Sequence, residues 1–81
     1  MHITYILRSE KTKKYYIGHT HDMESRLKCH NSGFVRSTKS GRPWTIVYKE
    51  FFKTKSEAYK REMEIKNYKG GIQFKEMLRL K

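Results

Sequence analysis

Two runs of β-branched and aromatic residues lie near the beginning of the chain, and they constrain its fold more than any other feature. Residues 2–7 (HITYIL) and 15–18 (YYIG) are predicted strands, and the polar residues 9–14 between them suit a hairpin connection. Strand alternation gives each run two distinct faces. A hairpin that turns within residues 9–14 would therefore bring Tyr5 and Tyr16 together on one face of the sheet.

The remaining elements follow from capping and periodicity. Thr20 or Asp22 can cap a helix to about Asn31, residues 34–43 form a basic loop, and residues 44–52 form a third strand. Thr54 and Glu57 match a capping box for a helix to about Tyr68, and residues 69–71 break that helix. Residues 72–80 form a short last helix whose inward-facing residues are Phe74, Met77, Leu78 and Leu80. The order is β-β-α-β-α-α. We expect one α+β domain over residues 1–81, a small three-stranded, mostly antiparallel sheet flanked by helices.

The charge balance indicates a polyanionic partner. Nineteen Lys and Arg against eight Asp and Glu give a net charge of +11, and a folded surface this basic repels itself. DNA, RNA and acidic membrane surfaces all fit this charge. No apolar run exceeds three residues, so we expect no membrane span, and the N-terminus lacks a signal-peptide pattern. Cys29 is the single cysteine, which excludes an internal disulfide and favours the reducing cytoplasm.

Glu62 is placed to point inward. It shares one helix face with Ala58 and Ile65, the apolar residues expected to face the core. A buried ionised carboxylate is costly unless it is paired or holds a metal. An ion pair with Arg61 or Lys66 and a metal site are therefore the two interpretations.

Two further groups of residues have a structural and a functional interpretation. Arg26 and His30 are four residues apart on one helix face, where they form either a phosphate site or a solvated polar face. Tyr5 and Tyr16 are either packing residues or a pair of functional phenols. Gly18 leaves room for a backbone or a ligand to approach.

Taken in order, these segments resemble the GIY-YIG nuclease domain, in its compact, free-standing form, over essentially the whole chain. The first motif is Ile3-Thr4-Tyr5, which departs from the family name at two positions, and the second motif, Tyr16-Ile17-Gly18, is intact. The other matching segments are residues 20–23, 26–27 and 30–33 in the first helix, residues 41–44 leading into 46–48 in the third strand, and residues 60–62 and 65–66 in the second helix. Asn67 is a weaker match for a polar residue of some members, because its spacing from Glu62 is short.

The resemblance implies a role for each candidate. Glu62 would be the single carboxylate ligand of a divalent ion, Mg²⁺ or Mn²⁺. Arg26 would bind the scissile phosphate and stabilise its developing charge. Tyr5 and Tyr16 would flank the attacking water, one of them as general base, and His30 would assist this network. A phenol with an ordinary pKa near 10 needs nearby cations or a proton relay to act as a base.

The basic surface would then bind the nucleic acid. We expect contacts to the backbone beside the site from Lys39, Arg42, Lys49, Lys53 and Lys55. The domain has no evident sequence-reading module, so it would recognise DNA structure or shape, or rely on a partner protein. A monomer is the default for so small a domain.

The sequence thus predicts a metal-dependent endonuclease that hydrolyses phosphodiester bonds in DNA, with RNA as an alternative substrate. A non-catalytic nucleic-acid-binding module with the same fold is the rival. A protein-interaction domain whose charge serves solubility is more distant. Retention of both Glu62 and Arg26 favours the enzyme, since a degenerate binder should have lost one of them first.

Overall fold

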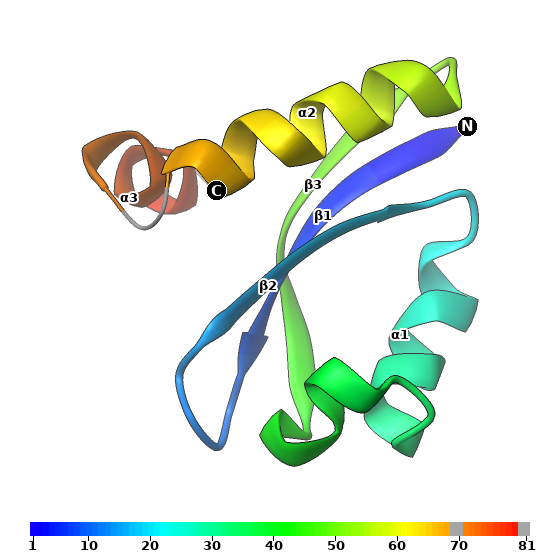
Figure 1. Ribbon diagram of the computed structural model, residues 1–81, viewed down its shortest axis with the longest axis vertical. Coiled ribbons are helices and arrows are strands. Elements are labelled where there is room, and N and C mark those ends of the chain that lie inside the picture. The colour runs from blue at the N-terminus through cyan, green and yellow to red at the C-terminus, as the bar shows by residue number, and fades with distance from the viewer. Residues whose placement is uncertain (69–70, 80–81) are drawn as a thin grey trace.

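The central strand of the sheet is β1 (His2–Ser9) in the computed structural model, which describes residues 1–68 and 71–79. It pairs antiparallel with β2 (Tyr15–Thr20) on one side and with β3 (Trp44–Phe52) on the other (Figure 1). The three predicted strands are confirmed, and every pairing is antiparallel. Both β1 and β2 run two residues beyond their predicted ends, because cross-strand pairing continues there.

Helix α1 (Met23–Ser32) begins and ends at the signals present in the sequence. Of the two predicted caps, Asp22 is the one used: its carboxylate accepts a hydrogen bond from the Ser25 amide at 3.1 Å. The helix ends at Gly33, whose φ of 91° lies in the left-handed region that glycine adopts at little cost.

The predicted loop 34–43 contains a short 3-10 helix, η1 (Arg36–Gly41). Its packing explains why it is ordered. Thr38 is fully buried, and its carbonyl accepts a hydrogen bond from the Trp44 indole at 2.7 Å. The contact between these two residues lies outside what local propensity can predict.

Helix α2 (Lys55–Tyr68) has the predicted capping box, in which Glu57 and Thr54 each accept a hydrogen bond from the other's amide at 3.2 Å. Helix α3 (Ile72–Arg79) buries Phe74, as expected, while the predictions for Lys69, Gly70 and Leu80 lie outside the described residues. Within residues 1–68 and 71–79, no helix combines the length and apolar character needed to cross a membrane.

The sheet separates two apolar clusters. Tyr5 and Leu7 pack with Trp44 on the face covered by α1 and η1, whereas Ile6 packs with Ile65 and Phe74 on the face covered by α2 and α3. Figure 1 shows the same division, with α2 and α3 on one side of the strands and α1 on the other. Strand alternation therefore assigns the faces correctly. Functional residues carried by α1 and by α2 must meet around an edge of the sheet.

Candidate active site

The two tyrosines meet on the α1 face, as expected. Their ring centroids lie 6.4 Å apart. Tyr5 is opposite Gly18 in the β1–β2 pairing, and a Cβ added at Gly18 would lie 2.6 Å from the Tyr5 hydroxyl oxygen. The glycine is therefore required because the phenol ring of the neighbouring strand lies across it.

A buried hydrogen-bonded chain runs from Tyr5 through α1 into η1. The Tyr5 hydroxyl lies 3.0 Å from His30 Nε2, and His30 Nδ1 lies 2.8 Å from Thr38 Oγ1. Because Thr38 donates its own hydroxyl proton to the Val35 carbonyl, it accepts from His30 Nδ1–H. His30 Nε2 is then unprotonated and accepts the Tyr5 proton.

Burial tunes both ends of this chain. It raises the pKa of the Tyr5 phenol to about 12, against the opposing effect of the Arg26 guanidinium. It also lowers the pKa of His30 to about 4, and the charge of Arg26 acts in the same direction. At neutral pH, Tyr5 is therefore protonated and His30 is neutral.

Arg26 lies between the two phenols. Its pKa is raised chiefly by the hydroxyl of Tyr5 and also by that of Tyr16, both of which stabilise the charged guanidinium. Arg26, Tyr5, Tyr16 and His30 thus form one cluster on the α1 face. The alternative of a merely solvated polar face does not describe this arrangement.

Glu62 reaches the same region from the opposite face of the sheet. Its two carboxylate oxygens are engaged separately, Oε1 with His19 Nδ1 at 2.5 Å and Oε2 with Lys66 Nζ at 2.6 Å. Of the two ion-pair partners expected from spacing, Lys66 is present, whereas Arg61 pairs with Glu50 and Glu64.

His19 connects the two faces at the β2 edge. The ring that contacts Glu62 also lines a groove of about 240 Å³ together with Arg26, Lys55 and others. The negative charge of Glu62 contributes to the raised pKa of Tyr5. Four of the five predicted catalytic residues therefore lie together on the α1 face, and Glu62 approaches them from the α2 face beside His19.

The predicted nucleic-acid-binding residues do not form a single patch. Lys55 lines the groove beside Arg26, whereas Lys39 and Arg42 line a separate pocket beside η1. Lys49 is exposed on β3, with its ammonium 5.9 Å from the Phe51 ring centroid, and Lys53 is exposed between β3 and α2. The charge composition of the sequence cannot show that these residues lie at separate places on the surface.

Sequence reasoning missed two residues of the site. His19 was not among the predicted site residues, although alternation from Ile17 along β2 places it on the α2 face. Thr38, which orients His30, carries no local signal, because its burial depends on how η1 packs.

The neutral, buried state of His30 predicts a pH-dependent stability. His30 ordinarily titrates near 6.5, but its pKa in the folded protein is about 4, so the unfolded chain binds more protons between these values. Stability should fall as pH drops from about 6.5 to 4, by on the order of 3 kcal/mol from this residue. Urea unfolding at pH 7.5, 6, 5 and 4 measures the loss.

Two variants isolate this contribution. His30→Gln should flatten the dependence, whereas His21→Gln, at an exposed position, should leave it unchanged. An equal decline in both variants would remove His30 as its source.

Comparison with known proteins identifies the family of this domain. Residues 1–74 match the model of the GIY-YIG catalytic domain. The chain is 43% identical over 68 residues to a UPF0213 protein of Staphylococcus haemolyticus and 46% identical to one of Staphylococcus saprophyticus, covering 83% of this chain and 82% of each relative. The solution NMR structure of a UPF0213 protein from Bacillus halodurans superposes with a TM-score of 0.62 at 31% identity, covering 99% of this chain and 84% of that one. The protein therefore belongs to the GIY-YIG family of nuclease domains.

Proposed function

We propose that this protein is a divalent-metal-dependent endonuclease that hydrolyses phosphodiester bonds in DNA. The observation that supports the proposal is the grouping of Arg26 with two phenols on the α1 face, with the Glu62 carboxylate approaching from the α2 face beside His19. Phosphodiester hydrolysis needs a water nucleophile, a cation for the developing charge and assistance to the leaving oxygen. The site has a residue suited to each requirement.

Arg26 would bind the scissile phosphate. Its planar guanidinium has several N–H donors, so it can donate two parallel hydrogen bonds to two oxygens of one phosphate. The Tyr5 phenol keeps it oriented without neutralising it, because burial raises the pKa of Tyr5 to about 12 and the phenol is uncharged at neutral pH. Arg26 would therefore stabilise negative charge as it grows on the phosphate oxygens.

Tyr5 would receive a proton from the attacking water. Its raised pKa makes a resting phenolate unfavourable, so it would accept that proton only as its own passes to His30 Nε2. Thr38 holds the imidazole in the tautomer that leaves this nitrogen free. Tyr16, which is less buried than Tyr5, would contact the water from the groove side.

Glu62 fits a magnesium or manganese ion by its chemistry. A carboxylate is the oxygen ligand that these ions prefer, and Mg²⁺ often uses one or two carboxylates together with waters and substrate phosphates. Within residues 1–68 and 71–79 no group of three or more His, Cys, Asp and Glu could form a fuller protein cage. Lys66 occupies one oxygen of Glu62 through a half-exposed side chain and could move aside for the metal.

The bound ion would supply positive charge to the phosphate and the leaving oxygen. The role of the protein would be to hold Glu62 in position, and His19 does so through Oε1.

Incubation with DNA tests the proposal. Purified protein should nick or cut supercoiled, single-stranded or branched DNA when Mg²⁺ or Mn²⁺ is added, and EDTA should stop the reaction. Binding that is tight and salt-sensitive without product from any substrate would favour the non-catalytic binding module instead. RNA of the same sequences, run in parallel, determines whether cleavage is confined to DNA.

A further inference from the structure

A strongly basic pocket lies away from the catalytic cluster, at the junction of the hairpin turn with η1. It has a volume of about 630 Å³ and is lined by Lys11, Asn31, Arg36, Lys39, Ser40 and Arg42. None of its lining residues in the described part of the chain is acidic. Among residues 1–68 and 71–79, none of its four cations takes part in an ion pair.

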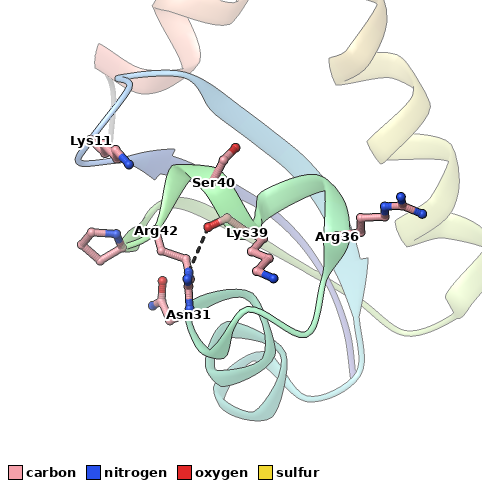
Figure 2. A pocket seen from close by; sticks show the side chains of 7 residues that line it. Lys11, Asn31, Arg36, Lys39, Ser40 and Arg42 are labelled. Atoms are coloured by element: carbon pink, nitrogen blue, oxygen red, sulfur yellow. Dashed lines mark hydrogen bonds between the residues drawn. The ribbon is translucent and has the colours of Figure 1, made fainter.

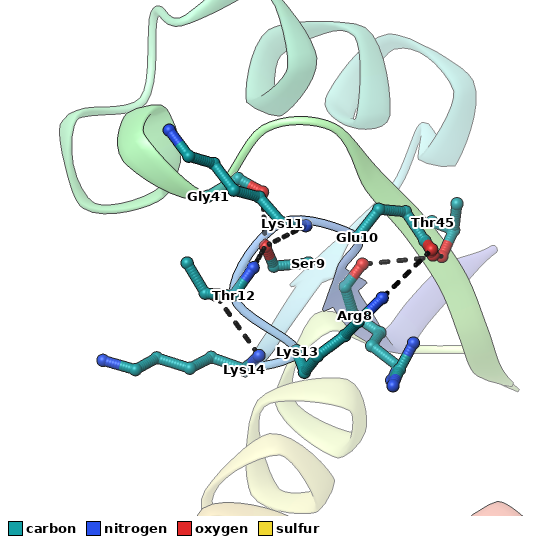
Figure 3. Close-up of polar contacts among 9 residues, drawn as sticks. All are labelled: Arg8, Ser9, Glu10, Lys11, Thr12, Lys13, Lys14, Gly41 and Thr45. Atoms are coloured by element: carbon teal, nitrogen blue, oxygen red, sulfur yellow. Dashed lines mark hydrogen bonds and ion pairs between the residues drawn. The ribbon is translucent and has the colours of Figure 1, made fainter.

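The hairpin turn is fixed over this pocket by Ser9. The buried Ser9 hydroxyl donates to the Gly41 carbonyl at 2.6 Å and accepts from the amides of Lys11 and Thr12 (Figure 3). A backbone hydrogen bond from Glu10 to the Pro43 carbonyl adds a second connection. Lys11 is therefore held beside η1, although 28 residues separate it from Lys39.

Arg42 is also held in place. Its Nε donates to the Lys39 carbonyl at 2.9 Å, and its guanidinium packs so closely on Gly33 that a Cβ there would lie 2.8 Å from Nη1. Asn31 is engaged with the Trp44 backbone through both amide atoms, so it supports the pocket wall. Figure 2 shows Lys39 beside Arg42 and the Arg36 guanidinium pointing away from them.

The pocket has a neighbouring hollow that reaches Tyr16. Ser40 lines it and also a second hollow of about 210 Å³, whose other walls include Tyr16 and Trp44. The pocket and this hollow therefore adjoin at Ser40. The molecule is 28 Å in its longest dimension, which corresponds to roughly eight base pairs at 3.4 Å each.

We propose that this pocket binds a second phosphate of the nucleic acid strand, through Arg42, Lys39 and Lys11. The choice of nucleic acid as ligand rests on the proposed function. A guanidinium held in place, together with two ammonium groups and no carboxylate among the described lining residues, suits a phosphate oxyanion. Contacts of this kind set the position of the strand and carry no base specificity, so the pocket would determine which phosphodiester reaches Arg26.

Binding measured in EDTA tests this proposal independently of cleavage. The variant Lys11→Gln/Lys39→Gln removes two pocket charges and keeps Arg42, which also packs on Gly33. The matched control is Lys60→Gln/Lys75→Gln, which removes two exposed charges from α2 and α3 on the other side of the sheet. Circular dichroism and thermal unfolding establish that both variants are folded.

Fluorescence anisotropy with a labelled twelve-base-pair duplex gives the affinities. Loss of one phosphate contact should weaken binding roughly tenfold at 0.1 M salt and reduce the slope of log K against log salt by about 1. The control should lose clearly less. Equal losses in the two variants would overturn the proposal, because general charge would then explain the binding.

The ends of the duplex identify the phosphate. If the pocket variant binds duplexes with 5′-hydroxyl ends and duplexes with 5′-phosphate ends equally more weakly than the parent, the pocket binds an internal phosphodiester. If the loss occurs only with 5′-phosphate ends, it binds a terminal phosphate. Either result supports a phosphate site. A chain that binds in this way but never cleaves would remove the proposed nuclease function and leave the pocket assignment standing.

Discussion

Glu62→Ala should abolish magnesium-dependent nicking while most DNA binding and the fold are retained. The variant removes the carboxylate that we propose as the oxygen ligand for the metal. DNA binding should persist, because the basic residues that we propose to contact the backbone are unchanged. Stability should fall by about 1–3 kcal/mol, since His19 loses its acceptor. Nicking of supercoiled DNA in Mg²⁺ and Mn²⁺ measures the loss of cleavage, and fluorescence anisotropy in EDTA measures DNA binding.

Glu64→Ala is the matched control for this variant. It removes the same charge from the same helix, but the Glu64 carboxylate is exposed and pairs with Arg61. Its rate should stay close to that of the parent. Glu62→Gln keeps the side-chain size and an acceptor for His19, yet it should be as inactive as the alanine variant. Cleavage by either Glu62 variant at the parental rate would show that the metal assignment is wrong.

Arg26→Ala should lower the cleavage rate by about 10²–10³, the usual cost of losing one electrostatic stabiliser of a transition state. The guanidinium interacts with both the Tyr5 and the Tyr16 hydroxyls, so its loss leaves these two phenols without that cation. The loss should appear mainly in kcat, because binding is shared among many surface cations. Single-turnover cleavage with saturating protein separates the effect on kcat from the effect on DNA binding.

Two further arginine variants sharpen this test. Arg26→Lys keeps the charge but loses the planar donors, so it should recover only part of the rate. Arg79→Ala removes an exposed charge from α3 and should leave the rate unchanged. An Arg26→Ala rate equal to that of the parent would exclude this residue from the site.

Local sequence signals predicted most of the architecture. The alternation in β1 correctly placed Tyr5 and Ile6 on opposite faces, and the Thr54–Glu57 capping box correctly marked the start of α2. These signals work because strand and helix periods determine side-chain direction within each element. The 3-10 helix within residues 36–41 was missed, because it is stabilised by burial of Thr38 and not by local propensity.

The same distinction applies to the candidate site. The amino-acid sequence by itself was enough to predict that Glu62 faces inward and that Tyr5 and Tyr16 share a sheet face, because both follow from periodicity. Packing between distant elements placed His19 against Glu62, Thr38 behind His30, and Lys11 beside Arg42. Periodicity gives the direction of a side chain, whereas its neighbours, its burial and hence its pKa depend on distances between elements far apart in the chain.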